Sequence, residues 1–128
     1  MVLAGAWAAD TGMVQPAELA AQLVGHRGAT VVMQVGPNVL YRSKHIPGAI
    51  YAGPASRPEG LELLRAVAAK LPRDGQIVLY CGCCPWDHCP NIRPALELMR
   101  QMGFAHVRVL YVPDNFKADW IDRGYPVQ

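Results

Sequence analysis

Residues 77–80 read Ile-Val-Leu-Tyr, an apolar run that follows the turn sequence Pro-Arg-Asp-Gly at 72–75. An apolar run of this length, without polar alternation, is typical of a strand that is buried on both faces. Such a strand needs a layer of other elements on each side of its sheet, and helices supply those layers in α/β proteins. The run therefore predicts a parallel strand at 76–80, inside a sheet that helices cover on both faces.

Further strands and helices alternate along the chain. Apolar and β-branched runs predict strands at 30–35, 49–52 and 107–112, and apolar residues at helical spacing predict helices at 16–24, 59–71, 92–102 and 116–123. We therefore expect a three-layer α/β fold with a central, mostly parallel sheet of about five strands. With 128 residues, 52% of them hydrophobic, the chain has the size and core of one domain.

The start of the chain is small and apolar, and Ala6-Trp7-Ala8 fits the A-x-A pattern of a signal-peptidase site. The segment lacks a basic beginning and a full apolar stretch. We therefore divide the chain into a flexible segment at 1–12, which is either the remnant of an export signal or a floppy start, and a domain at 13–127. The compartment stays open between cytoplasm and periplasm. No run reaches the roughly 18 apolar residues that span a bilayer, so we expect a soluble mature chain.

The charge distribution limits the classes of partner. The formal net charge is +2, and no two Lys or Arg residues are adjacent. A nucleic-acid surface or an anionic membrane is normally met by clustered basic residues, so we expect neither as a partner. Small anions are the more plausible charged ligands.

All four cysteines lie at residues 81–89, directly after the buried strand and before a predicted helix. A turn between a parallel strand and a helix points backbone N–H groups at whatever it holds, which lowers the pKa of a thiol and favours an anion. Ligands of such sheets bind at the carboxyl ends of the strands, where this turn lies. Sulfur chemistry is therefore the leading interpretation.

Several motifs together resemble the rhodanese (sulfurtransferase) family. They are the turn sequence His-Ile-Pro-Gly-Ala-Ile at 45–50, the Tyr-Cys pair at 80–81, the Gly-Phe-x-x-Val-x-Val-Leu segment at 103–110 and the closing Trp-x-x-x-Gly-Tyr-Pro-Val at 120–127. They occur in the family's order over about residues 13–127. The resemblance implies a single rhodanese-like domain at 13–127.

The resemblance also implies a function and a site. Cys81 occupies the place of the catalytic cysteine, which in the family accepts a sulfane sulfur as a persulfide and passes it to a thiophilic acceptor. The other thiols of the loop, Cys83, Cys84 and Cys89, become relay or resolving thiols. The expected partners are a small sulfur-containing anion or persulfide donor and a thiol acceptor or partner protein, with no diffusible cofactor. The candidates for binding the substrate are Gly82, Trp86, His88 and Arg93.

The loop also admits other chemistry. Its 81–91 segment is longer than the family's usual loop, and Gln34-Val35-Gly36 stands where the family usually has Asp-x-Arg. The C-x-x-C spacing of Cys81 and Cys84 suits thiol-disulfide exchange, and a bond between Cys84 and Cys89 would only shape the loop. A non-catalytic binding module is a further alternative.

A metal site is the remaining alternative. Its ligands would be soft and would suit zinc or monovalent copper. They would come from Cys81, Cys83, Cys84, His88 and Cys89.

Overall fold

The part of the chain that the structure describes forms a sheet of five parallel strands. The computed structural model describes residues 12–25 and 30–128, and its strands follow the order β1-β5-β4-β2-β3. Their bounds are β1 Met13–Val14, β2 Thr30–Gln34, β3 Ile50–Tyr51, β4 Gln76–Tyr80 and β5 Val107–Leu110. The apolar run of the sequence is β4, which lies at the centre of the sheet, as predicted.

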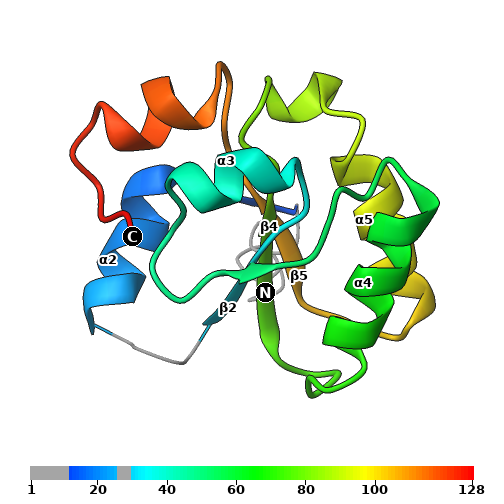
Figure 1. The fold of residues 1–128 in the computed structure, drawn as a ribbon. Coiled ribbons are helices and arrows are strands. Elements are labelled where there is room, and N and C mark those ends of the chain that lie inside the picture. The colour runs from blue at the N-terminus through cyan, green and yellow to red at the C-terminus, as the bar shows by residue number, and fades with distance from the viewer. Residues whose placement is uncertain (1–11, 26–29) are drawn as a thin grey trace.

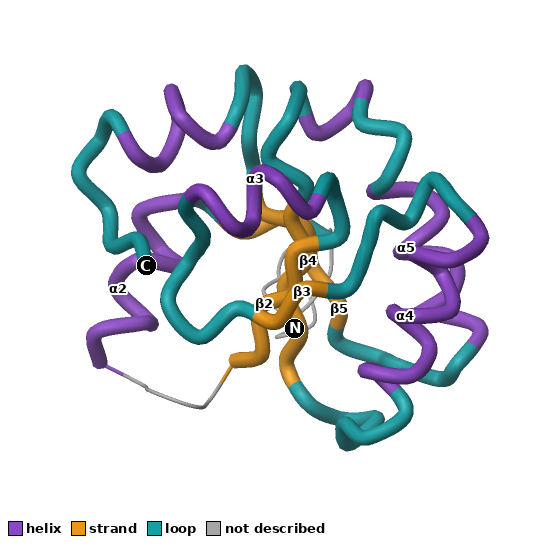
Figure 2. The backbone as a smooth tube through the Cα atoms, in the orientation of Figure 1, coloured by secondary structure: helices purple, strands orange, loops and turns teal. Residues whose placement is uncertain are grey.

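Helices cover both faces of this sheet (Figures 1 and 2). The α-helices are α2 Pro16–Gly25, α3 Asn38–Ser43, α4 Pro58–Ala68 and α5 Ile92–Gln101. Two short helical turns complete the described elements: a 3-10 turn η1 at Trp86–His88, which precedes α5, and a π-helical turn η2 at Lys117–Ile121, which follows β5. Helices α4 and α5 pack side by side on one face, and α2 lies on the other. The predicted three-layer α/β class is confirmed.

Alternation along β4 explains why the strand has no polar position after its first residue. Ile77 and Leu79 pack into the core under α4 and α5, whereas Val78 and Tyr80 pack into the core that contains α2 and Trp120. The next residue in this alternation is Cys81, and its side chain joins the α4 and α5 side. The period of two residues in a strand therefore decides the face on which the first thiol lies.

Strand β1, helix α3 and the 3-10 turn η1 were not predicted from the sequence. Strand β1 is only two residues long and pairs with β5 at the edge of the sheet. Helix α3 buries none of its six residues, so it has no apolar stripe that a periodicity can reveal. With η1 and η2, α3 gathers at the carboxyl end of the sheet, which is the upper edge in Figure 1. These short elements surround the region where the strands β2, β4 and β5 end.

The N-terminal export signal stays a prediction, because residues 1–11 lie outside the described residues. Within 12–25 and 30–128, no helix has the length and apolar character needed to cross a membrane.

A Tyr80→Phe variant is expected to lower the free energy of unfolding by about 1–3 kcal/mol. The Tyr80 hydroxyl accepts a buried hydrogen bond from the Ile46 N–H at 3.1 Å, and phenylalanine would leave that N–H without a partner. Tyr125→Phe is the matched control, because no described residue bonds to the Tyr125 hydroxyl. Urea unfolding measures both variants. Equal midpoints would contradict this account of the hydroxyl.

Candidate functional site

The four thiols form one cluster at the carboxyl end of β4. Their sulfur atoms all lie within 4.8 Å of one another. Cys81 and Cys89 are buried, Cys84 is half-buried and Cys83 is exposed, and none is in a disulfide. The loop therefore folds back on itself and brings its first and last thiols together under the surface. Cys83 is the cluster's contact with solvent.

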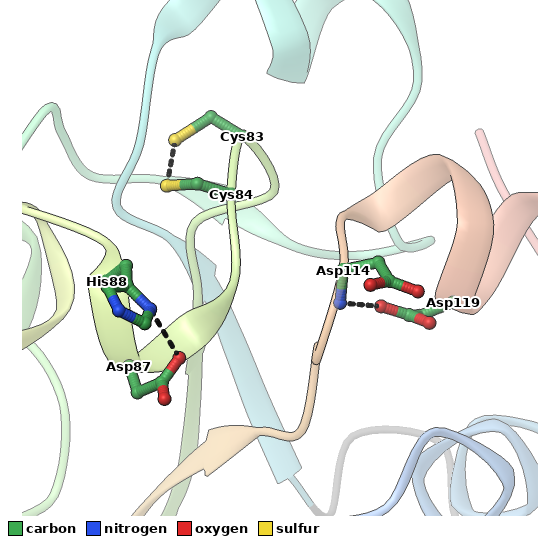
Figure 3. Close-up of polar contacts among 6 residues, drawn as sticks. All are labelled: Cys83, Cys84, Asp87, His88, Asp114 and Asp119. Carbon is green, nitrogen blue, oxygen red and sulfur yellow. Dashed lines mark hydrogen bonds and ion pairs between the residues drawn. The ribbon is translucent and has the colours of Figure 1, made fainter.

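Sulfur contacts run from the interior to the surface through this cluster. The Cys81 Sγ lies 3.3 Å from the Cys83 Sγ, which in turn lies 2.7 Å from the Cys84 Sγ. Figure 3 shows the Cys83 and Cys84 side chains turned toward each other. This chain of contacts joins a buried thiol to an exposed one, so a sulfur atom or a disulfide could pass between them by thiol exchange.

Asn91 is a site residue that the sequence analysis missed. Its Oδ1 accepts a hydrogen bond from the Ser56 N–H at 2.8 Å, which fixes the orientation of the amide. The opposite end, Nδ2, then points to the sulfur atoms of Cys81 at 3.2 Å and Cys89 at 3.8 Å. Because Nδ2 can only donate hydrogen bonds, the buried amide stabilises negative charge on these two sulfur atoms. Nothing in the local sequence pattern reveals this role, because Ser56 is distant along the chain.

Gln34 and Gly36 brace the loop from the end of β2. The Gln34 Nε2 donates to the Cys81 carbonyl at 2.9 Å, and its Oε1 accepts from the Gly36 N–H at 3.0 Å. A Cβ at position 36 would lie 2.5 Å from the Cys81 oxygen and 2.7 Å from its sulfur, so only glycine fits. A neutral amide and a close backbone approach therefore brace the site where the family usually has charges.

Hydrogen bonding within the cluster separates the acidities of its thiols. A hydrogen bond from Cys81 and further donation from the N–H groups of Asn91 and Ile92 lower the pKa of Cys89 to about 6. The same bond to Cys89, together with burial, raises the pKa of Cys81. Burial, with a smaller contribution from the bond to Cys83, raises the pKa of Cys84 to about 12. Negative charge in the cluster therefore concentrates on Cys89, next to the start of α5.

A cavity of about 540 Å³ opens beside the cluster. Cys83 is the cluster thiol that lines it, and the cations on its lining are Lys44 and Lys117. The remaining lining residues are Gln34, Leu40, Ser43, Tyr80, Gly82, Asn115, Phe116 and Ile121. The Lys117 ammonium is paired with the Asp122 carboxylate at 3.0 Å. The cavity therefore combines an exposed thiol, an apolar wall and the positive side chain of Lys44, which suits a small anionic or sulfur-containing ligand.

A buried carboxylate holds the far wall of the cavity in place. Asp119 is 3% exposed, and its Oδ2 accepts a hydrogen bond from the Asp114 N–H at 2.8 Å (Figure 3). The same oxygen accepts the Asn115 N–H at 3.1 Å. These bonds fix the turn that leads into Phe116, whose ring stacks on Tyr80 at 5.1 Å. The wall that faces the thiol loop is thus held by hydrogen bonds and aromatic contacts.

Two of the proposed substrate-binding residues, Gly82 and Trp86, help to shape the thiol loop. Gly82 has φ +96°, a conformation that favours glycine, and it lines the cavity. Trp86 packs against the core on the α4 and α5 side, and its backbone N–H donates to the Val112 carbonyl at 2.9 Å. Trp86 therefore anchors the loop. It is not among the residues that line the cavity.

The other two proposed residues lie apart from the sulfur atoms. His88 is exposed, and its Nδ1 lies 3.1 Å from the Asp87 carboxylate. Arg93 is exposed in the first turn of α5, and no hydrogen bond or ion pair of the described residues involves its side chain. Neither belongs to the sulfur group or lines the cavity.

Comparisons with known proteins identify the fold. No protein-family model and no curated protein matches the chain. Among solved structures, it resembles a rhodanese-related protein of Thermoplasma volcanium with a TM-score of 0.63 and 20% identity, over 91% of this chain and 97% of the other.

Two further solved structures are similar. One is a single-domain sulfurtransferase of Saccharomyces cerevisiae, with a TM-score of 0.62 and 16% identity over 88% of this chain and 90% of that one. The other is a Rhodopseudomonas palustris protein of unknown function described as a possible tyrosine phosphatase, with a TM-score of 0.64 and 18% identity over 91% and 84%.

The sheet topology and the thiol loop define the structural class of the protein. The described residues form a parallel α/β domain with four clustered thiols on the loop at the carboxyl end of its central strand. The likeness to these solved structures narrows that class: the chain has the fold of rhodanese-like single-domain proteins. The rhodanese resemblance of the sequence is therefore confirmed for the fold.

Proposed function

We propose that the protein is a sulfurtransferase that carries a sulfane sulfur as a persulfide on Cys81. The observation that carries this proposal is the position of Cys81 at the end of the central strand, with three more thiols within 4.8 Å. The likeness to a yeast single-domain sulfurtransferase supports the same class of reaction. Burial and the bond to Cys89 raise the pKa of Cys81, so its thiolate would form by giving its proton to the neighbouring Cys89 thiolate, and the Asn91 Nδ2 donor at 3.2 Å would stabilise the resulting anion.

The proposed cycle has two steps. The Cys81 thiolate attacks the outer sulfur of thiosulfate, forming a new S–S bond while the old S–S bond breaks and sulfite leaves with the electron pair. An acceptor then takes the outer sulfur of the persulfide: cyanide becomes thiocyanate, or a thiolate becomes a persulfide, and Cys81 regains its thiolate. No net oxidant is needed, because the sulfane sulfur keeps its oxidation level throughout.

The cavity is the proposed entrance for donor and acceptor. Lys44 would attract an anion such as thiosulfate, whereas the Lys117 ammonium is already paired with the Asp122 carboxylate at 3.0 Å. Cys83 reaches both the cavity and the Cys81 sulfur, so it would relay sulfur between the interior and the acceptor. Cys84 and Cys89 would serve as resolving thiols when a disulfide forms.

Phosphoryl transfer is less well supported than sulfur transfer. A phosphatase of this kind needs cations over the loop to neutralise the developing charge. The 81–91 segment contains no Lys or Arg, and it carries four thiols where a phosphatase needs one. The composition of the loop therefore favours sulfur.

Intact mass spectrometry tests the function directly. The denatured chain is expected to gain about one sulfur (~32 Da) after thiosulfate, on a peptide that contains Cys81, and to lose it after cyanide. A Cys81→Ser variant is expected to gain none and to release no thiocyanate. His88→Ala is the control, because that exposed side chain lies outside the cluster. Sulfur uptake that survives in Cys81→Ser and disappears in another cysteine variant would refute the assignment of Cys81.

A further inference from the structure

We infer that the four thiols form a binding site for a single thiophilic metal ion, with zinc as the fitting ion. The ligands are Cys81, Cys83, Cys84 and Cys89. This site goes beyond sulfur transfer and does not depend on it, because ion binding needs only the positions of the four sulfur atoms.

The spacing of the sulfur atoms fits one ion. A tetrahedral zinc ion with Zn–S bonds of about 2.3 Å sets its sulfurs about 3.8 Å apart. The four sulfurs all lie within 4.8 Å of one another, and the Cys81–Cys83 separation is 3.3 Å. The main adjustment is at Cys83 and Cys84, whose sulfurs lie 2.7 Å apart and must separate. Cys83 is exposed, so its side chain is free to rotate.

The surroundings of the sulfurs are those of a supported metal site. Thiolate ligands are normally stabilised by N–H donors beyond the metal, and such partners hold the ligands in place. Asn91 supplies that donor to Cys81 and Cys89, and its amide is itself held by the N–H of Ser56. Gln34 fixes the backbone of Cys81 from the other side. Two of the four ligands are thus positioned before any ion arrives.

The chemistry of the ligands selects the ion. The group holds sulfur alone, without a carboxylate, which excludes the hard ions calcium and magnesium and favours zinc or monovalent copper. An iron–sulfur cluster spreads four thiolates over several iron atoms, which needs sulfurs further apart than these. His88 is not in the group, so the metal set expected from the sequence loses its one nitrogen ligand.

Zinc titration of the reduced, chelator-stripped full chain tests the site. With a chromophoric chelator as competitor, one zinc ion is expected per chain, and native mass spectrometry is expected to show the same stoichiometry. Cobalt in place of zinc is expected to give the visible absorption of a tetrahedral thiolate complex. Binding without that spectrum, or no binding at a stoichiometric zinc concentration, would overturn the inference.

Variants identify the ligands. Cys83→Ser and Cys84→Ser are each expected to weaken zinc binding by on the order of 100-fold, and Asn91→Ala by about 10–100-fold. His88→Ala is expected to bind like the wild type. Circular dichroism checks that each variant is folded, and Cys83 is the safest because it is exposed. Unchanged affinity in folded Cys83→Ser, or lost affinity in His88→Ala, would refute the four-thiolate site.

The tests of the metal site and of sulfur transfer are independent of each other. Zinc affinity is measured without any sulfur donor, and sulfur uptake is measured on the stripped protein without zinc. A bound ion would occupy the Cys81 thiolate, so the zinc-loaded protein is expected to take up no sulfur from thiosulfate, and a chelator is expected to restore uptake. Full uptake with zinc still bound would overturn the placement of the ion on Cys81.

Discussion

A Gly36→Ala variant is expected to lose about 1–3 kcal/mol of unfolding free energy and to transfer sulfur about 100-fold more slowly. The new methyl group would lie 2.5 Å from the Cys81 carbonyl oxygen and 2.7 Å from the Cys81 sulfur. The carbonyl belongs to the backbone and is held by Gln34, so it cannot rotate away. The reactive thiol must therefore move. Urea unfolding and thiocyanate formation measure the two effects.

Gly25→Ala is the matched control for that variant. Gly25 ends α2, and a Cβ built there meets no atom of the described residues within 4 Å. Its transfer rate is expected to equal that of the wild type, and its stability to be unchanged or up to about 1 kcal/mol higher, because alanine favours a helix more than glycine does. If Gly36→Ala lost stability but kept the wild-type rate, the close contact between Gly36 and Cys81 would matter for folding and not for the proposed sulfur transfer. Wild-type stability and rate in Gly36→Ala would contradict the steric account altogether.

Removing the indole of Trp120 is expected to cost about 3–5 kcal/mol of unfolding free energy, a large share of the stability of a domain of this size. Trp120 is fully buried, and its ring stacks on Phe116 at 6.0 Å and meets the edge of Tyr125 at 5.2 Å. A Trp120→Ala variant would leave an empty space behind the Phe116 wall of the cavity. The midpoint of urea unfolding is the measurement.

Trp120→Phe separates the ring from its hydrogen bond. The indole Nε1 donates to the Pro126 carbonyl at 2.7 Å, and phenylalanine keeps most of the ring while losing this donor. The phenylalanine variant is therefore expected to lose about 1–3 kcal/mol, less than the alanine variant. Equal losses in the two variants would show that the hydrogen bond, and not the packing of the ring, stabilises this region.

The sequence predicted those elements whose burial leaves a pattern. The apolar run at 77–80 predicted the central strand, and α2 and α5 show apolar stripes at helical spacing. Helix α3 buries nothing and β1 has two residues, so neither leaves a period to detect. The terminal helix expected at 116–123 is the shorter π-helical turn of η2, although Trp120 is turned inward as predicted.

The site was predictable only in part. Four cysteines on a strand-to-helix loop are visible in the sequence, so the thiol loop and its position in the fold were predicted. The support of that loop comes from contacts between distant parts of the chain, Gln34 with Cys81 and Ser56 with Asn91. Local patterns carry no information about such pairs. The closeness of the four sulfurs also depends on how the loop folds, which its spacing alone does not determine.

The pairing of β1 with β5 has a consequence for biosynthesis. Met13 lies beside Val109, and Val14 beside Leu110. A ribosome adds residues from the N-terminus onward, so β1 leaves the ribosome long before its partner exists. That edge of the sheet can close only after the thiol loop and α5 have been synthesised. Until then the loop's four cysteines are attached to an unfinished domain, and the burial that the complete fold gives Cys81 and Cys89 is not yet in place.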